Sequence, residues 1–427
     1  MADRYCGMCH GERGCIGCTK ANRTTEYNGL TEFFDPCAVS VLEPSNDSEQ
    51  ERSDGVRGGF FFAADLGTTT LAFGAWDALG NPVSSFGMVN PQCEWAADVI
   101  GRVDAALLGK ADLLRISIKE ALLKGFLFVA KDAIFEKDSE VTIAIAGNTV
   151  MQHLLMGDSV EGFSGAPFVP FRREGVCIGF AALFEEVIRE DALKSGIPKP
   201  VFKATVHLMP CFSAFVGGDI FAGAYALGML PNQSAFSQNT LFADFGTNGE
   251  LLLRTREGLF AASAAMGCAF EGGRFSYASD LFEKIAKALS TGKMDETGLL
   301  LEPYFSEGFE GLTMEDIRSF QEAKGALWAG TNLLCQEAKI APKDIKVLYL
   351  GGSIGRFVPK EVIKQIGLFP KEMNVQAVLV GNACLGGLKK MFRDGDFPVQ
   401  CSANTVSLAE NKEFQEIYLK GMYFEQD

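Results

Sequence analysis

The sequence lacks the features that would place it on a nucleic acid or in an export pathway. It has no block of lysines and arginines, and its 39 basic side chains stand against 54 acidic ones, a formal net charge of −15 over 427 residues. This negative surplus repels nucleic acids and anionic membranes, so we expect neither as a partner. The first twenty residues contain no apolar run of the kind that a signal peptide needs. This composition predicts a cytoplasmic protein with thiols rather than disulfides.

The sequence also has no apolar run that is typical of a membrane span. Residues 208–230 come closest, with Asp219 as their single charge. An aspartate at the centre of a bilayer costs about 3 kcal/mol. Pro210, Gly217 and Gly218 interrupt the run further. We therefore interpret this stretch as a buried strand, a glycine turn and a core helix.

Three glycine-containing loops follow short apolar strands and carry the main functional signal. They are Asp65-Leu66-Gly67-Thr68-Thr69-Thr70, Asp244-Phe245-Gly246-Thr247-Asn248-Gly249-Glu250 and Gly351-Gly352-Ser353-Ile354-Gly355. Glycine leaves no Cβ in the way, so such loops direct backbone N–H groups and hydroxyls at phosphate oxygens. The carboxylates of Asp65 and Asp244 suit Mg²⁺, which keeps most of its waters and takes one or two carboxylates. An ordinary turn explains one such loop, but their recurrence favours a nucleotide site.

The order of the loops resembles the actin, heat-shock chaperone and sugar kinase (ASKHA) superfamily. Further stretches narrow the match: Asn90-Pro91-Gln92 with residues 97–100, residues 146–151 with His153, residues 213–220, and residues 261–272. With them, the region from about 60 to about 388 resembles the ATP-dependent reductive activators of corrinoid proteins. In that resemblance the loops at Asp65 and Asp244 are the first and second phosphate motifs, and residues 351–355 are the adenosine motif.

The resemblance implies an α/β fold of two RNase H-like lobes, as in actin-like ATPases. We expect a cysteine-rich head at 1–40, an acidic linker at 41–59, lobe I at 60–240 and lobe II at 241–427. The pattern predicts strands at 60–65, 70–76, 82–88 and 141–146, with helices at 97–108, 113–131 and from about 149. In the second lobe it predicts strands at 241–243, 249–254, 258–262 and 345–350, with helices at 279–289, 314–340 and 360–366. Residues 408–419 fit either a helix or a strand.

The head contains Cys6, Cys9, Cys15 and Cys18 within thirteen residues, in a C-x2-C-x5-C-x2-C array. Zinc favours paired C-x2-C knuckles, but these usually stand a dozen or more residues apart. Iron-sulfur ligation accepts a compact array, and the C-x5-C-x2-C part resembles the ferredoxin loop of the corrinoid activators. We favour an iron-sulfur cluster, with zinc as the alternative. Haem attachment normally needs an exported chain and is disfavoured.

The head departs from the family in length. Only five residues precede Cys6, too few for the strands that flank such a loop in a ferredoxin domain, so we expect no [2Fe-2S] β-grasp module. A small [4Fe-4S] site fits the four thiolates, and Cys37 is a substitute ligand. The other cysteines lie in apolar or glycine-rich contexts and are expected to be buried spectators.

For ATP hydrolysis we assign catalytic roles to four carboxylates. Asp65 and Asp244 orient the metal hydration shell, and Glu250 or Asp219 orients the attacking water. A turn or capping carboxylate is the alternative for Asp219. The remaining nucleotide-binding residues are Gly67, Thr68, Thr69, Thr70, Gly246, Thr247, Asn248, Gly249, Gly351, Gly352, Ser353 and Gly355. His153 is expected to be buried and hydrogen-bonded, with a role facing the corrinoid as the alternative.

The resemblance implies a protein that uses ATP to return the cobalt of a partner corrinoid protein, in a methyltransferase system, from Co(II) to Co(I). Activators of 2-hydroxyacyl-CoA dehydratases share the nucleotide fold, but they carry a cluster between two subunits and their cysteines lie inside the fold. The sequence also leaves a homodimer open for this protein. A metabolite kinase needs a catalytic base beside an acceptor pocket, which the sequence does not reveal. An ATP-binding scaffold with a zinc-bearing docking head is the non-enzymatic alternative.

Overall fold

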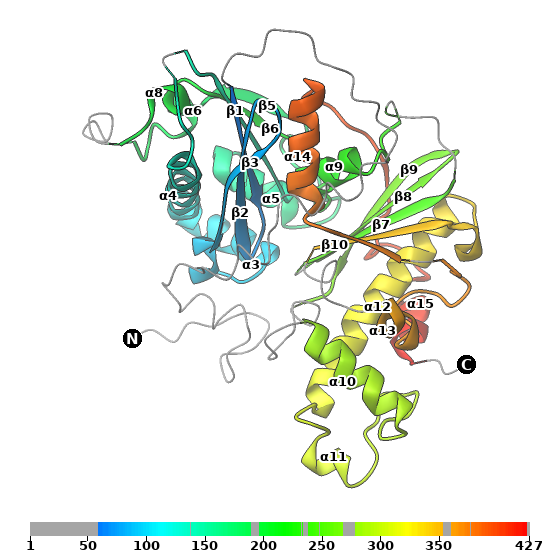
Figure 1. Ribbon diagram of the computed structural model, residues 1–427. Coiled ribbons are helices and arrows are strands. Elements are labelled where there is room, and N and C mark those ends of the chain that lie inside the picture. Colours follow the sequence, from blue (N-terminus) through cyan, green and yellow to red (C-terminus); the bar gives the residue numbers. More distant parts are fainter. Residues whose placement is uncertain are drawn as a thin grey trace. The chain divides into compact units, whose positions relative to one another are not determined.

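The computed structural model describes residues 59–424 except 137, 189–195, 232, 234–237, 247, 268–277, 353–359 and 376 (Figure 1). The cysteine-rich head, the linker up to residue 58, Thr247, Ser353 and Gly355 therefore lie outside the described residues. Within the described part of the chain, no helix has the length and apolar character needed to cross a bilayer.

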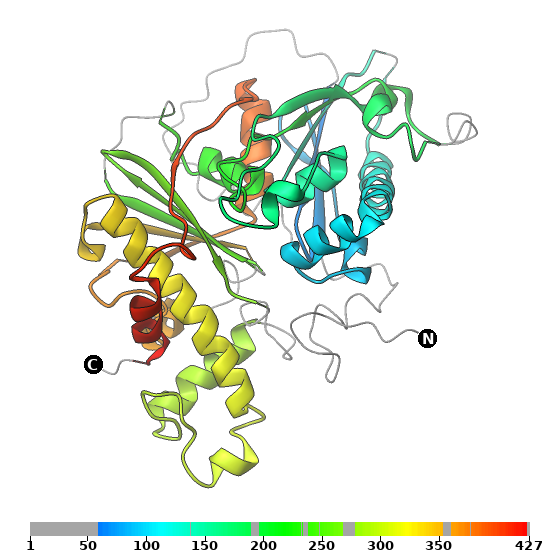
Figure 2. The same cartoon turned by 180° about the vertical axis from the view of Figure 1, so that it is seen from behind.

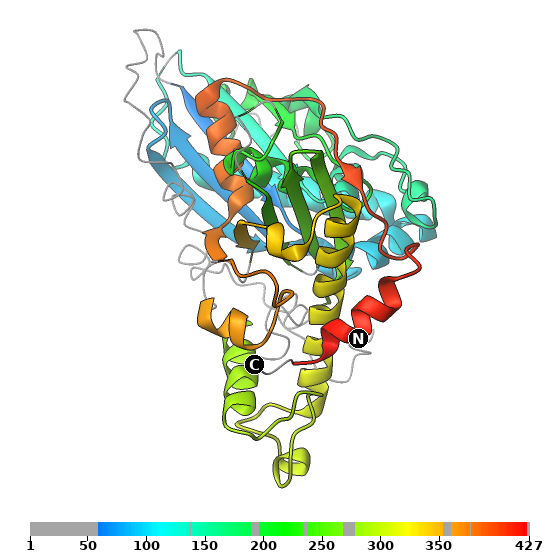
Figure 3. The same cartoon turned by 90° about the vertical axis from the view of Figure 1, so that its right-hand side faces the viewer.

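The described chain divides into two compact units. Residues 59–228 and Asn382–Ser402 form unit 1, and residues 229–381 and 403–424 form unit 2. The sequence boundaries had placed Asn382–Ser402 in the second lobe, whereas these residues pack in unit 1. Helix α14 (Ala383–Asp394) lies along helix α9 (Gly218–Ala226) so closely that a Cβ on Gly387 would sit 1.8 Å from the carbonyl oxygen of Ala222 (Figure 3).

Unit 1 is built on a six-stranded sheet in the order β3-β2-β1-β4-β6-β5. The strands are β1 (Phe60–Leu66), β2 (Thr70–Asp77), β3 (Pro82–Val89), β4 (Val141–Gly147), β5 (Val176–Gly179) and β6 (Thr205–Leu208). The first three form an antiparallel meander, while β4 runs parallel to β1 and β6 parallel to β4. Strand β1 is apolar on both faces, as expected for a strand in the middle of a covered sheet.

The first α-helix of unit 1 differs from the expected one. The expected helix at 97–108 is shorter, because Asp98 caps α3 (Val99–Ala105) by accepting from Gly101 N, and a π-type turn follows at Ala106–Lys110. Gly109 in this turn has φ 88°, which breaks the helix before α4 (Ala111–Ala130). The other helical elements are η2 (Pro91–Glu94), α5 (Thr149–Met156), η4 (Glu161–Phe163), α6 (Phe180–Leu183) and α8 (Lys199–Phe202).

Unit 2 repeats the strand order of unit 1. Its sheet runs β11-β10-β7-β8-β9-β12, so that β9-β8-β7-β10-β11 repeats β3-β2-β1-β4-β6, with the same antiparallel meander and parallel neighbours. The strands are β7 (Thr240–Phe245), β8 (Asn248–Thr255), β9 (Gly258–Ala265), β10 (Val347–Gly352), β11 (Ala377–Gly381) and β12 (Asn404–Thr405). This repetition confirms the two RNase H-like lobes expected from the sequence.

The described part of unit 2 contains one long helix that packs on this sheet and several shorter helical elements. They are α10 (Ala278–Ser290), α11 (Tyr304–Glu307), α12 (Met314–Glu337), η6 (Pro342–Asp344), α13 (Lys360–Gln365) and α15 (Phe414–Met422). The long helix α12 packs on β8 and β9 (Figure 2). A capping box between Thr313 and Asp316 fixes its start. Helix α15 packs on α12, which settles the choice left open for residues 408–419 in favour of a helix that starts at Phe414.

Candidate nucleotide-binding site

The first phosphate loop is a tight turn between β1 and β2. Leu66 ends β1 and β2 begins at Thr70, so residues 67–69 make the whole connection. A Cβ on Gly67 would lie 2.5 Å from the carbonyl oxygen of Thr70, so only glycine fits this turn. Asn90 holds the loop from outside by donating Nδ2 to the Gly67 carbonyl at 2.9 Å.

Arg102 is a second support of this loop, and sequence reasoning missed it. Its side chain is completely buried, and Nη2 donates to the carbonyl oxygen of Thr68 at 2.5 Å. Further guanidinium hydrogen bonds reach Ala96 O and Gln92 Oε1. Burial lowers the pKa of Arg102 from its usual value, and the nearby Cys93 opposes that shift. A buried guanidinium with this many acceptors fixes the backbone around it.

Asp65 is the penultimate residue of β1, and its carboxylate accepts hydrogen bonds from side chains at the start of α14. Asn382 donates Nδ2 to Asp65 Oδ2 at 2.7 Å, and the Cys384 thiol also donates to this carboxylate. Burial raises the pKa of Asp65 to about 6, and these two hydrogen bonds oppose the rise. The carboxylate is therefore costly to ionise without a cation, which is the setting of a metal-binding or catalytic acid.

Asp219 stands in the first turn of α9, close enough to Asp65 for the two carboxylates to repel each other. Burial, followed by the negative charge of Asp65, raises the pKa of Asp219 to about 7. Its Oδ1 accepts from its neighbour Ile220 N at 2.9 Å. The structure thus brings together two of the four carboxylates that the sequence analysis singled out, both within unit 1.

The end of β4 completes this cluster. Asp65 pairs with Ala146 and Leu66 with Gly147 across the parallel β1 and β4. A Cβ on Gly217, at the start of α9, would lie 2.5 Å from Gly147 O, 2.6 Å from Asn148 Cα and 2.8 Å from Asp219 Oδ1. Gly217 therefore lets α9 and the end of β4 approach each other beside Asp219.

His153 lies in α5 and is buried, which confirms the expectation of a buried, hydrogen-bonded histidine. Its Nδ1 contacts the carbonyl oxygen of Thr149 at 2.7 Å, and its Nε2 accepts from Arg172 N at 3.2 Å. Both ring nitrogens are therefore engaged, with Nδ1 as the donor. Burial lowers the pKa of His153, so the neutral imidazole that these bonds need is favoured.

In unit 2 the second phosphate loop joins β7 to β8. Asp244 pairs directly with Glu250 across these antiparallel strands, which puts both carboxylates on the same face of the sheet. Gly351 pairs with Asp244 from β10, and Gly352 has φ 70°. A Cβ on Gly352 would lie 2.5 Å from Asp244 Oδ1. The acid of the second loop and the first glycines of the adenosine motif are therefore neighbours.

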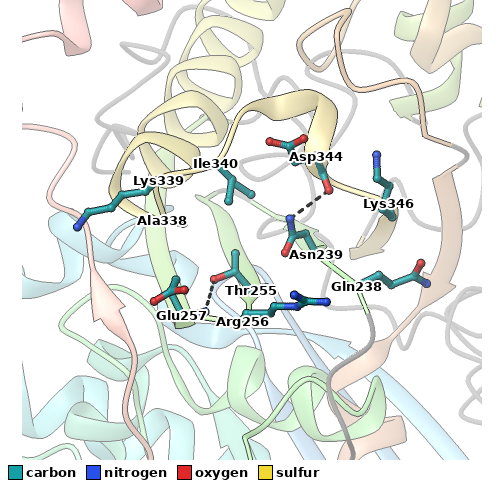
Figure 4. A pocket seen from close by; sticks show the side chains of 10 residues that line it. All are labelled: Gln238, Asn239, Thr255, Arg256, Glu257, Ala338, Lys339, Ile340, Asp344 and Lys346. Atoms are coloured by element: carbon teal, nitrogen blue, oxygen red, sulfur yellow. Dashed lines mark hydrogen bonds between the residues drawn. The ribbon is translucent and has the colours of Figure 1, made fainter.

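A cavity of about 680 Å³ lies elsewhere in unit 2 (Figure 4). It opens where β7 and β10 begin, and Asp244 lies at the other end of β7. Asn239 donates Nδ2 to the carbonyl oxygen of Asp344 at one side of it. Of the site residues expected from the sequence, none that the structure describes lines this cavity.

The described residues fit Mg²⁺ but include no cluster of three or more histidines, cysteines and carboxylates that would hold a transition metal. Asp65 and Asp244 each follow the pattern of a single carboxylate at a strand end, which is the kind of ligand that a hydrated Mg²⁺ accepts. The four head cysteines lie outside the described residues.

Two family models and a curated relative match this chain. The family described as "RACo middle region" matches residues 60–232, and the one described as "C-terminal domain of RACo the ASKHA domain" matches residues 238–280 and 308–427. A curated relative, corrinoid activation enzyme RamQ of Eubacterium limosum, is 25% identical over 453 aligned positions, which cover 89% of this chain and 72% of that protein.

A solved structure agrees with the fold. The chain is similar to a reductive activator for corrinoid, iron-sulfur protein, with a TM-score of 0.71 at 21% identity over 87% of this chain and 67% of that one. The two family matches describe consecutive parts of one kind of protein, in the same order, and together they span both sheets. The chain belongs to the RACo family of reductive activators of corrinoid proteins, within the ASKHA superfamily.

Proposed function

We propose that this protein couples ATP binding and hydrolysis to the reductive activation of a corrinoid protein in a methyltransferase system. The product is Co(I), formed from a Co(II) centre in the partner. Family membership carries this proposal, and the repeated placement of an aspartate at the end of the first strand of each sheet supports it. Lobe I, lobe II and the cysteine head keep the roles that the resemblance implies.

Binding of ATP falls to the glycine loops of both units. Asp65 and Asp244 orient the water shell of Mg²⁺, and the backbone N–H groups and hydroxyls of both loops bind the phosphates. The residues proposed for the phosphates are Gly67, Thr68, Thr69, Thr70, Gly246, Thr247, Asn248 and Gly249. Those proposed for adenosine are Gly351, Gly352, Ser353 and Gly355.

Hydrolysis needs a group that accepts hydrogen bonds from water in line with the γ-phosphorus. Asp219 is our first choice, because its raised pKa lets it take a proton near neutral pH. Glu250 is the second choice, because it faces the same side of the sheet as Asp244. Positioning and charge neutralisation supply most of the rate in such reactions.

Reduction of Co(II) to Co(I) takes one electron, and the residues proposed to bind ATP cannot transfer it. We propose that Cys6, Cys9, Cys15 and Cys18 hold an iron-sulfur cluster, which when bound supplies one-electron transfer. The array of four thiols within thirteen residues supports this assignment. Zinc at the same cysteines would leave ATP binding intact and remove the relay.

ATP binding must also change the arrangement of the lobes. The reduction of Co(II) is uphill for ordinary donors, so the nucleotide must favour one arrangement of the lobes and the corrinoid protein must bind that arrangement better. The coupling is reciprocal, since a partner that prefers the ATP-bound arrangement must raise the affinity for ATP by the same factor. We therefore expect the corrinoid protein to strengthen nucleotide binding and to stimulate hydrolysis.

The test uses full-length protein purified without oxygen. Titration calorimetry with MgAMPPNP should detect binding in the wild type and much weaker binding in Asp65→Asn and Asp244→Asn. Asp112→Asn is the control, because Asp112 is exposed and pairs only at the surface with Arg115. Absence of heat in folded wild-type protein would contradict the ATP site. Iron with acid-labile sulfide supports the cluster, and zinc without sulfide contradicts it.

A further inference from the structure

Asn148 directly follows β4, and its side-chain amide is only partly hydrogen-bonded. It is 3% exposed, and its Oδ1 accepts from Val150 N at 3.0 Å, so the side chain caps α5. Among the described residues, its Nδ2 has no hydrogen-bond partner. Buried polar groups are almost always paired, so an unpaired buried amide needs an explanation.

The surroundings of Asn148 indicate what that explanation is. Gly217 lies between the backbone of Asn148 and the carboxylate of Asp219, since a Cβ on Gly217 would lie 2.6 Å from Asn148 Cα and 2.8 Å from Asp219 Oδ1. Asp65 is near enough to Asp219 to disfavour its ionisation. Thus the residue that carries the unpaired donor adjoins Asp219 and, through it, Asp65, the carboxylates assigned to the attacking water and the metal.

Two helices also begin here. Asn148 caps α5, whereas Gly217 at the start of α9 makes no side-chain capping bond. The first N–H groups of a helix carry partial positive charge and favour an anion. A donor amide and two helix starts at one point form a suitable environment for a phosphoryl oxygen.

We propose that Asn148 is a nucleotide-binding residue whose side-chain Nδ2 donates a hydrogen bond to a γ-phosphoryl oxygen of bound ATP. The γ-phosphoryl group is the acceptor, rather than the α or β group, because Asn148 adjoins Asp219, the residue proposed to orient the water that attacks it. The inference rests on the proposed ATP site and adds a sensor for the terminal phosphate. It explains why the fold leaves a buried donor without a partner in the protein.

The experiment compares Asn148→Ser and Asn148→Asp with the wild type in full-length protein. Both replacements retain an oxygen that can cap α5, and both remove the amide donor. Calorimetry measures the affinities for MgAMPPNP and MgADP. We expect Asn148→Ser to weaken AMPPNP binding by about 10- to 100-fold, the ratio for one hydrogen bond to a charged acceptor, and to change ADP binding less than about twofold. Asn148→Asp should weaken AMPPNP binding more, because it adds a negative charge.

Thermal melting without nucleotide gives a second readout. A merely structural amide would make Asn148→Ser melt lower than the wild type, whereas a functional donor predicts an unchanged or higher melting temperature and a smaller rise on adding AMPPNP. Asn411→Ser is the matched control, because Asn411 also accepts from a nearby backbone N–H through Oδ1, at an exposed position in unit 2.

The outcomes separate this inference from the proposed function. If the wild type binds no AMPPNP, the ATP site itself is wrong. If the wild type binds normally and Asn148→Ser binds AMPPNP equally well, only the role of Asn148 is overturned. An equal loss of ADP and AMPPNP affinity would also overturn it, since the contact would then lie away from the γ-phosphoryl group.

Discussion

Asn382 donates a hydrogen bond from Nδ2 to Asp65 Oδ2 across 2.7 Å, although the two residues lie 317 positions apart in the chain. The same side chain caps α14, because its Oδ1 accepts from Leu385 N at 2.8 Å. Both ends of the amide are therefore fixed. The chain returns to unit 1 at Asn382, so a segment inserted between two stretches of unit 2 orients the acid of the first phosphate loop.

Asn382→Asp should weaken MgATP binding at pH 7. The new carboxylate can still cap α14, but it replaces a donor to Asp65 with a negative charge, and both changes raise the pKa of Asp65 above about 6. We expect about a tenfold loss of affinity at pH 7, recovered as the pH rises. Calorimetry from pH 6 to 9 measures this. Asn382→Ser, which removes the donor without adding charge, should show a smaller effect in the same direction; unchanged affinity in both variants would refute the role.

Asp219→Asn should lower kcat for ATP hydrolysis with little change in KM, and it should move the acidic limb of the pH profile downward. The limb moves because the group with a pKa of about 7 is gone, so the limb then follows Asp65, whose pKa is about 6. The replacement is nearly isosteric, so ATP binding is retained. An equal loss in kcat and in ATP affinity would instead indicate a structural role for Asp219.

The same pair sets a pH dependence of stability. Both carboxyl groups have raised pKa values in the folded protein, so the fold favours their protonated forms. Their contribution is complete below about pH 4 and is lost as the pH rises through 6 to 7. Without Mg²⁺ and nucleotide, the free energy of unfolding should fall by on the order of 6 kcal/mol between about pH 4 and pH 7, because one pKa is raised by about 2 and the other by about 3, and a difference of one in pKa corresponds to about 1.4 kcal/mol. Urea unfolding at several pH values measures the fall, which Asp219→Asn should reduce.

Arg102→Met should raise the KM for ATP about tenfold and lower stability by about 3 kcal/mol, because it leaves several buried acceptors without a donor, among them the Thr68 carbonyl. Steady-state kinetics and urea unfolding measure the two effects. Arg115→Met is the control. Arg115 bonds to Glu186 at the surface, where an ion pair contributes at most about 1 kcal/mol. An Arg102→Met protein with wild-type KM would exclude a role in holding the loop.

Much of the fold could be predicted because its strands are apolar and sharply bounded. Strands β1, β7 and β10 each end in a glycine loop, and the repeated strand, Asp-x-Gly-Thr, strand order indicated the duplication. The start of α3 was missed although the signal was present, since Asp98 is a favoured N-cap residue directly before Val99.

The rest of the candidate site could not be read from local patterns. Nothing near Asn382 in sequence points to Asp65, because their contact depends on the packing of α14 against α9. Arg102 looks like an ordinary charged residue on a helix, and only the fold shows that its acceptors surround it in the interior. The raised pKa values of Asp65 and Asp219 likewise arise from burial, which depends on tertiary structure.

Gly67→Ala should abolish nucleotide binding, because the added Cβ would lie 2.5 Å from the backbone oxygen of Thr70 and force the loop open. The loss should appear as no melting-temperature rise on adding MgAMPPNP. Gly179→Ala is the matched control in the same unit, since Gly179 has φ −68° and no atom within 4 Å of the added Cβ. Nucleotide binding by Gly67→Ala equal to that of the control would show that this turn does not cradle phosphate.

The central claim is that ATP drives the reduction of a corrinoid partner. The most direct measurement mixes the full-length protein, a corrinoid protein in the Co(II) state and an electron donor without oxygen, and follows Co(I) by its absorbance. The account predicts that Co(I) forms with MgATP and does not form without nucleotide or with the Asp65→Asn and Asp244→Asn variants. Formation of Co(I) at the same rate in the absence of ATP would contradict it.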